Sequence, residues 1–285
     1  MSAILSEKLT GLIPNEITTE IIKKVINGSF CLQNSRREGM TTESKTIPVM
    51  TEMPGPTWVG EGKKINVVEP TIVPVVLKAK KLGMIITASR ETLEDTILDT
   101  FENLKDAIAD SFYKVIDKAI IMGDTLEDGK VFTSLYEVAS NQAISRSDKS
   151  LLDDLSDTMA LVENNNYSVT NIIALNTLKN EIRKIKTKND EYLITDTSDL
   201  FSTKVHYTSQ LDKAKTNLIT GDFNNLITGI YKDITYDVLR EATLDLGGGK
   251  EINLAQQDMV AIRVTMRVAS QILREDAFSL IKPAI

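Results

Sequence analysis

The sequence predicts an α+β fold built around one very long helix. Residues 90–122 carry apolar side chains at spacings of three and four, which is the period of an amphipathic helix. Residues 65–77 and 259–268 are rich in β-branched residues, which is typical of strands. Residues 124–229 alternate helical and strand patterns, as in a compact α/β unit. Together these patterns predict an elongated molecule with the helix as its spine.

Composition limits the class of protein. The 285 residues are 42% hydrophobic and 26% charged, close to the globular average and enough for a substantial core. No apolar run approaches the ~20 residues that span a bilayer. The first residues also lack the basic and apolar regions of a signal peptide. We therefore expect a protein that is made and kept in a cytoplasm, with no membrane partner.

The residues that usually carry catalysis are scarce. Cys31 is the only cysteine and His206 the only histidine, whereas zinc sites and catalytic triads need several such groups or a tuned base. His206 lies in a strand-like stretch, which favours a structural role. Residues 247–250 read Gly-Gly-Gly-Lys, but Glu251 follows where a phosphate-binding loop needs Ser or Thr, so a turn between two strands is expected. We therefore expect a protein that is not an enzyme, with no catalytic residues and no bound metal or cofactor.

The chain is acidic. Its 33 Lys and Arg residues against 40 Asp and Glu give a net charge of −7. Proteins that grip DNA usually present a basic face, so this charge argues against tight phosphate binding, although a wall that encloses nucleic acid remains compatible. Residues 183–188 are the best candidate for a basic patch, and they form either a solvated helix end or a local DNA-binding patch.

Residues 15–26 predict a short helix before Gly28, with a single apolar stripe made of Ile17, Ile21, Ile22, Val25 and Ile26. Such a helix cannot bury its stripe alone, so we expect an arm that lies over another surface.

Residues 65–68 and 71–81 predict two long antiparallel strands joined at Glu69-Pro70. Pro74 cannot donate a ladder hydrogen bond, so its strand should be an edge. The hairpin either packs on its own domain or projects as a loop onto a neighbouring subunit.

Ser89 is a suitable N-cap for the long helix, and Gly123 ends it. At ~1.5 Å per residue the helix spans about 50 Å. The helix is either the spine of the molecule or one helix of a coiled coil. Its expected apolar stripe is Leu93, Ile97, Phe101, Leu104, Ile108, Phe112, Val115 and Ala119.

Beyond the spine, the sequence predicts helices over 151–162 and 176–186 and strands over 171–175, 218–223, 234–239 and 259–268. The last strand alternates cleanly. Its apolar face holds Val260, Ile262, Val264, Met266 and Val268, and Arg263 and Arg267 lie on the other face.

Short motifs in this order resemble the Hong Kong 97 type major capsid protein family of tailed phages. Thr57-Trp58-Val59-Gly60-Glu61-Gly62 is similar to the signature that opens the family's extended loop. The other matching segments are residues 12–14, 28–29, 40 and 46–48 (arm), 75–83 and 88–95 (return strand and helix start), 116–123 (helix end), and 221–223 and 274–278 (later strands).

The resemblance implies an α+β Hong Kong 97 type capsid fold with an N-terminal arm, extended β-hairpin loop, long spine helix, peripheral domain and axial domain. The expected boundaries are 1–55 for the arm, 56–84 for the loop, 85–125 and 230–270 for the peripheral domain, and 126–229 and 271–285 for the axial domain.

The implied function is that of a major capsid protein, a structural subunit of the virion. It would self-assemble in the bacterial host cytoplasm into pentamers and hexamers of an icosahedral shell that encloses double-stranded DNA without sequence-specific binding. Because the chain begins almost at the arm, either scaffolding comes from a separate protein, which we expect together with a portal, or none is used. The alternatives are an encapsulin-like nanocompartment shell protein and a small cytoplasmic α+β enzyme.

The residues expected to contact neighbouring subunits belong to the arm, the extended loop and the last long strand. They are Ile17, Ile21, Val25, Trp58, Val59, Glu61, Ile65, Val67, Ile72, Val75, Leu77, Arg263 and Arg267.

Overall fold

The computed structural model describes residues 15–283 except 53–54, 66, 68, 128, 148–149, 187–188 and 195, and for 15–21, 51–52, 90–105 and 233 it describes the backbone alone. The α-helices are α2 (Asn15–Gly28), α3 (Phe30–Asn34), α4 (Arg90–Ile121), α5 (Leu135–Ala139), α6 (Leu151–Asn164) and α7 (Leu178–Arg183). The strands are β1 (Arg36–Gly39), β2 (Ser44–Glu52), β3 (Thr71–Lys78), β4 (Lys80–Ser89), β5 (Thr125–Leu126), β6 (Gly129–Lys130), β7 (Ala143–Ser145), β8 (Asn171–Leu175), β9 (Asp199–Leu200), β10 (Thr203–Thr208), β11 (Leu218–Gly221), β12 (Leu226–Leu239), β13 (Thr243–Asp245), β14 (Glu251–Asn253), β15 (Met259–Ile272) and β16 (Phe278–Lys282).

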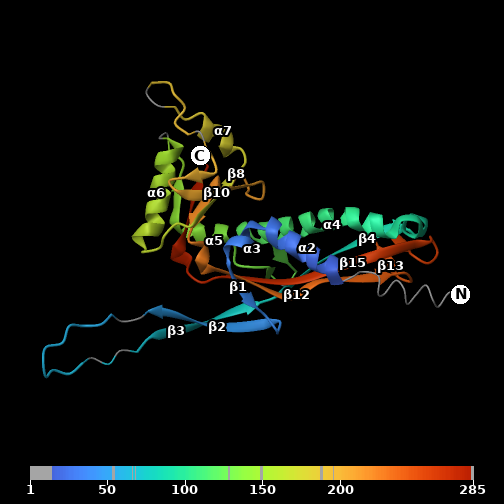
Figure 1. Ribbon diagram of the computed structural model, residues 1–285, viewed down its shortest axis with the longest axis horizontal. Coiled ribbons are helices and arrows are strands. Elements are labelled where there is room, and N and C mark those ends of the chain that lie inside the picture. Colours follow the sequence, from blue (N-terminus) through green and yellow to red (C-terminus); the bar gives the residue numbers. More distant parts are fainter. Residues whose placement is uncertain are drawn as a thin grey trace.

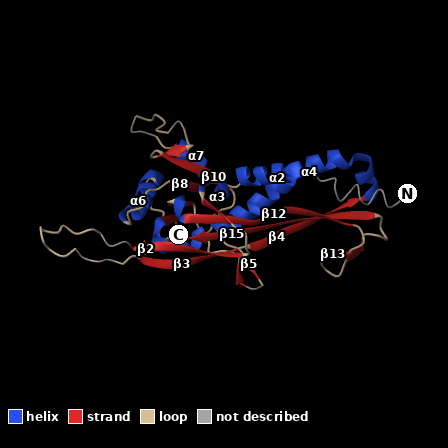
Figure 2. Cartoon of the chain, turned by 60° about the horizontal axis from the view of Figure 1, so that its bottom comes forward, coloured by secondary structure: helices blue, strands red, loops and turns tan. Residues whose placement is uncertain are grey.

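A four-stranded sheet in the order β1-β12-β15-β4 runs along the molecule beneath α2 and α4 (Figures 1 and 2). The alternation predicted for β15 is confirmed. Ile262, Val264 and Met266 are buried on the face toward the helices, and Arg263 is exposed on the opposite face. No helix among the described residues covers this second face of the sheet (Figure 2).

The spine helix α4 is confirmed, with 32 residues from Arg90 to Ile121 and a length of about 48 Å. Gly123 follows its C-cap with φ of 86°, which only glycine adopts easily. Val115 was wrongly placed on the apolar stripe, because it is 41% exposed whereas Ile116 is 3% exposed. After Phe112 the buried row continues by four residues and not by three.

Ile108, Phe112 and Ala119 are buried as expected, and the side chains of Leu93, Ile97, Phe101 and Leu104 lie outside the described residues. The helix contacts α2 and the sheet of its own subunit, which favours the spine over the coiled-coil alternative.

A six-stranded sheet in the order β7-β16-β11-β8-β10-β9 forms an upright unit at one end of the spine (Figure 1). The predicted strands over 171–175 and 218–223 are its central neighbours, β8 and β11, which pair antiparallel. Helices α5 and α6 pack on β16. One continuous apolar core joins this unit to the spine, so the two sheets are held together by burial. Among the described residues, no helix is long and apolar enough to span a membrane.

The hairpin differs from its prediction. β3 pairs with β2, whereas the described residues between 65 and 68 form no strand. The β-branched run at 65–68 had the composition of a strand but lies in the long loop between the paired strands. Residues 44–52, which were expected in the arm, therefore belong to the hairpin. The Gly-rich segment 247–250 is, as predicted, a turn between two strands, β13 and β14.

The edge position predicted for Pro74 is confirmed, because β2 and β3 form a sheet of only two strands. Pro74 lies directly opposite Pro48. Neither proline has a backbone N–H, so neither strand donates a ladder hydrogen bond at this position.

Candidate assembly surfaces

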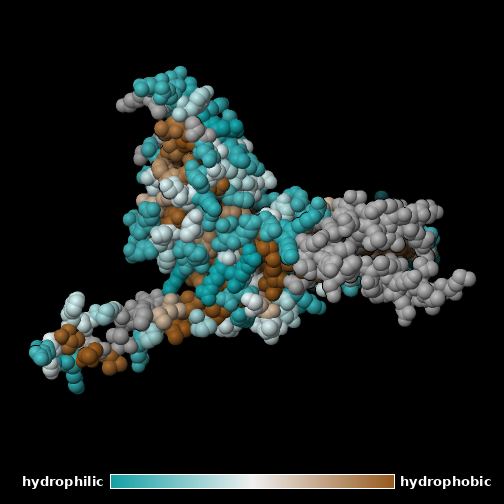
Figure 3. All heavy atoms as spheres, in the orientation of Figure 1, coloured by the Kyte–Doolittle hydropathy of each residue, from teal (hydrophilic) through white to brown (hydrophobic). Residues whose placement is uncertain are grey.

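The extended loop joins β2 to β3 and projects from one end of the molecule (Figure 1). Three of its described apolar side chains are largely or fully exposed. Trp58 is 105% exposed, Ile65 79% and Val67 93%. Brown atoms at the tip of this loop in Figure 3 show the same feature. Burying large aromatic and β-branched side chains lowers the free energy, so this loop is the strongest candidate in the molecule for contact with a partner.

The root of the same hairpin is anchored within the subunit. Leu77 is fully buried in a small core with Met40, Ile47 and Ile227. Gly229 makes this close approach possible, because a Cβ there would lie 2.8 Å from Leu77 Cδ2. The loop therefore projects from a fixed base.

The arm does not behave as predicted. Helix α2 packs along α4 of its own subunit, and Val25 is fully buried there. Lys24 also pairs with Asp106 of α4. The stripe of α2 therefore has a partner inside the subunit, and the expectation that the arm must lie on a neighbour is wrong for its C-terminal part.

A buried carboxylate fastens the turn between α2 and α3 to the spine. Asp117 of α4 accepts hydrogen bonds from the Ser29 hydroxyl (2.6 Å), the Phe30 N–H (3.0 Å) and the Cys31 N–H (3.2 Å). Burial raises the pKa of Asp117 above its usual value, although these hydrogen bonds act in the opposite direction. Asp117 lies in the helix-end motif recognised in the sequence, but its role as an anchor was not predicted.

The two residues with possible catalytic chemistry are part of the same packed region. The ring of His206 stacks on Phe30 with 4.4 Å between centroids, and burial lowers the pKa of His206. Cys31 is buried, and burial raises the pKa of its thiol, so it is a poor nucleophile. Within the described part of the chain, no group of three His, Cys, Asp or Glu residues could hold a metal ion.

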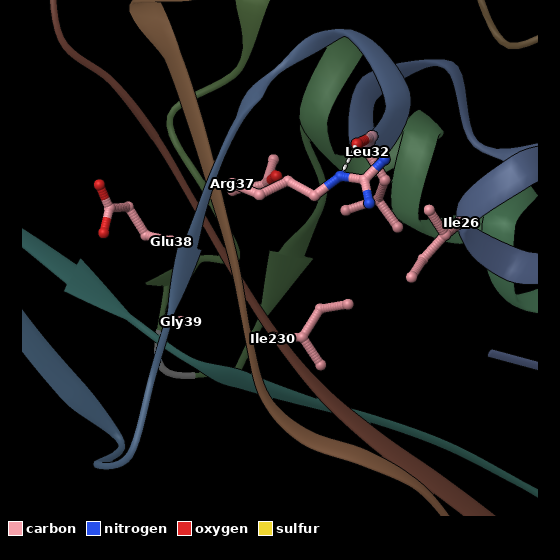
Figure 4. A pocket seen from close by; sticks show the side chains of 7 residues that line it. Ile26, Leu32, Arg37, Glu38, Gly39 and Ile230 are labelled. Atoms are coloured by element: carbon pink, nitrogen blue, oxygen red, sulfur yellow. Dashed lines mark hydrogen bonds between the residues drawn. The ribbon is translucent and has the colours of Figure 1, made fainter. Parts of the chain in front are cut away.

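A small hollow of about 180 Å³ lies beside the arm (Figure 4). Ile26, Leu32 and Ile230 line it, with Gly39 and Glu38 at β1. Arg37 reaches across and donates from Nε to the Leu32 carbonyl oxygen at 2.9 Å. The hollow is therefore formed where the arm turns into the four-stranded sheet.

The expected contact residues fall into four groups. Exposed ones are Trp58, Val59, Glu61, Ile65, Val67, Ile72 and Arg263; half-buried ones are Val75 and Arg267; fully buried ones are Val25 and Leu77; Ile17 and Ile21 have side chains outside the described residues. Val25 and Leu77 fill the subunit's own core, so we remove them from the contact set. Apolar pattern alone could not distinguish a side chain buried in its own subunit from one buried against another.

Comparison with known proteins identifies the family. The chain matches the Phage capsid family over residues 10–282. It is 31% identical to the major capsid protein of Staphylococcus phage 80alpha, over 99% of this chain and 88% of that protein.

Solved structures share the fold. A chain from Microbacterium phage Oxtober96 has a TM-score of 0.76 at 22% identity, covering 90% of this chain and 91% of that one. One from Mycobacterium phage Adephagia has a TM-score of 0.75 at 20% identity, covering 90% of each. A capsid chain of an empty GTA particle has a TM-score of 0.66 at 18% identity, covering 89% of each chain.

These matches do not favour the nanocompartment and small-enzyme alternatives. The α+β fold, the spine helix and the projecting loop agree with the family match over nearly the whole chain. The chain thus belongs to the Phage capsid family and has the Hong Kong 97 type fold of a tailed-phage major capsid protein, a component of the virion capsid.

Proposed function

We propose that this chain builds an icosahedral shell from pentamers and hexamers of itself, enclosing the double-stranded DNA genome, and that it catalyses no reaction. The exposed apolar loop carries the proposal. Trp58, Ile65 and Val67 leave large apolar surfaces in water, and a neighbouring copy in a closed symmetric assembly would cover them.

The two sheets suggest how the subunit is divided. The six-stranded sheet and its helices would form the axial domain, facing the symmetry axes. The four-stranded sheet with α4 would form the peripheral domain. The hairpin then includes β2 as well as β3, so the loop region begins near residue 44 and not at 56. Residues 226–272 hold β12 and β15 of the four-stranded sheet, so this whole segment would belong to the peripheral domain.

The remaining partners follow from the same proposal. Scaffolding would come from a separate protein, and a portal would occupy one vertex. The net charge of −7 fits a wall that encloses DNA without sequence-specific contacts.

Electron microscopy of the purified protein tests the proposal. We expect uniform polyhedral shells, or free pentamers and hexamers. A soluble monomer that forms no shells at high concentration, even with a scaffolding protein added, would contradict it.

A further inference from the structure

The open face of the four-stranded sheet holds a polar hollow of about 250 Å³. Its floor includes Thr235 of β12 and Thr265 of β15, whose hydroxyls hydrogen-bond at 2.8 Å. Gly83 of β4 pairs with Thr265, and a Cβ at Gly83 would come within 3.0 Å of Thr265 Cγ2. A larger residue than glycine would therefore crowd the floor of the hollow.

Four cationic side chains line this hollow, from three adjacent strands: Lys81, Lys232, Arg263 and Arg267. Among the side chains that the structure describes, only Arg263 of these four has a close acidic partner: its Nε and Nη2 donate to Asp237 at 3.1 and 2.8 Å.

Arg267 reaches the carboxylate of Glu43 only at 3.8 Å. Lys81 and Lys232 pair with no carboxylate in the described part of the chain. The hollow thus carries excess positive charge on a subunit whose net charge is negative. Such a site favours an oxyanion.

An apolar side chain lies beside the hollow on the same face. Ile85 of β4 is the direct neighbour of Arg263 in the sheet and is 49% exposed. An occupant that fits the whole surface therefore brings a carboxylate and an apolar group close together.

The tip of the extended loop offers both groups. Lys63 N–H donates to the Gly60 carbonyl oxygen at 3.1 Å, and Gly62 has φ of 75°, so a tight turn places Glu61 at its corner. Trp58 is fully exposed three residues earlier. Glu61 has no ion-pair partner in the described part of its own chain. The loop also extends away from the sheet that holds the hollow (Figure 1).

We infer that Glu61 of one copy binds in the cationic hollow of a neighbouring copy, with Trp58 packed against Ile85. Arginine guanidinium planes also attract an aromatic face, which adds to the fit of Trp58 beside Arg263. Glu43, which lies 3.8 Å from Arg267, would provide a counter-charge for Lys63 or Lys64, the residues that follow Glu61. The inference rests on the proposed shell, because it needs a second copy.

A charge-swap series tests the contact. Glu61→Lys and Arg267→Glu should each lower the yield of shells, counted by electron microscopy and sedimentation, by at least about tenfold. The double variant should restore it, because the opposite charges then meet again. A mixture of the two single variants should recover part of the yield, since each supplies the charge that the other lacks. Glu69→Lys is the matched control, with the same charge change in the same loop, and should leave the yield unchanged.

Crosslinking gives an independent readout. A bismaleimide should join Glu61→Cys to Lys232→Cys between copies in intact shells, producing a ladder of covalent oligomers. Cys31 is buried and should stay unmodified. Crosslinking of Glu61→Cys to Arg37→Cys at the arm hollow, or no rescue in the double variant, would overturn the inference. If the unaltered protein forms no shells, the proposed function fails instead, and the two failures remain distinguishable.

Discussion

The arm and the extended loop were both expected to pack on a neighbouring subunit, but the structure buries the described part of the arm on its own subunit and leaves the loop exposed. Both carry apolar residues that short elements cannot bury alone. The arm buries Val25 against α4 and is anchored by Asp117, whereas the loop leaves Trp58 in water. In this chain the apolar residues of the arm are buried where polar contacts tie the backbone to the spine, and those of the loop stay exposed where the described residues make no such contact. The loop is tied at its root by Leu77, and its tip lies beyond any such anchor.

Removing the carboxylate of Asp117 should have the largest effect on the arm. Asp117→Ala leaves the Ser29 hydroxyl and two backbone N–H groups buried without an acceptor. We expect a loss of roughly 3 kcal/mol in the free energy of unfolding, measured by urea denaturation of dilute subunits. The control is Asp106→Ala, whose exposed pair with Lys24 should contribute less than about 1 kcal/mol. Equal losses in the two variants would mean that the anchor is unimportant.

Crowding the contact between α2 and α4 should have the next largest effect. A Cβ at Gly28 would lie 2.5 Å from Cδ1 of Tyr113 on α4. Gly28→Val should therefore cost about 2 kcal/mol and make the arm easier to cleave by a protease. Gly55→Val is the control, because a Cβ at Gly55 meets no atom within 4 Å. An arm that stays protected in Gly28→Val would show that α2 is not held by this contact.

The pH dependence of the anchor should be smaller. The pKa of Asp117 is raised in the folded state, so the folded protein holds this proton more tightly than the unfolded chain. Its contribution to stability is then most favourable below the unfolded pKa and is lost as the pH rises through the folded pKa. Against Asp117→Asn, the unaltered protein should gain relative stability as the pH falls from 7 toward 4, measured by thermal melting. A difference that is constant with pH would contradict the raised pKa.

Changing the loop tip should have the smallest effect on the subunit itself. Trp58→Ser replaces a fully exposed side chain, so the free energy of unfolding should change by less than about 0.5 kcal/mol while the yield of shells falls. Leu77→Ala, at the buried root of the same hairpin, should cost roughly 3 kcal/mol. If Trp58→Ser destabilised the dilute subunit as much as Leu77→Ala, the loop would not be a free surface.

Long, regular elements were predictable because their pattern is local. The spine helix was expected over residues 90–122 and spans Arg90–Ile121, and the alternation in β15 correctly separated its buried and exposed faces. Trp58, Val59 and Glu61 were named as contact residues from a motif in the loop; all three are exposed, and their contact with a neighbouring subunit stays a prediction.

The pairing of strands that are far apart in the sequence was not predictable. The strand that pairs with β3 is β2, some 20 residues upstream across a loop, and β1 pairs in parallel with β12 almost 200 residues away. A strand composition does not specify its partner, because register depends on which faces become buried together. For the same reason the run at 65–68 was read as a strand although it lies in the loop.

The sequence alone therefore determined the α+β class, the spine helix and the family to which the chain is similar, because these follow from local periodicity, composition and motif order. Only the tertiary structure decided that the arm lies on its own subunit, that Asp117 anchors it and that four cations from three strands meet in one hollow. Each of these depends on residues that are brought together by packing, and packing is a property of the whole chain.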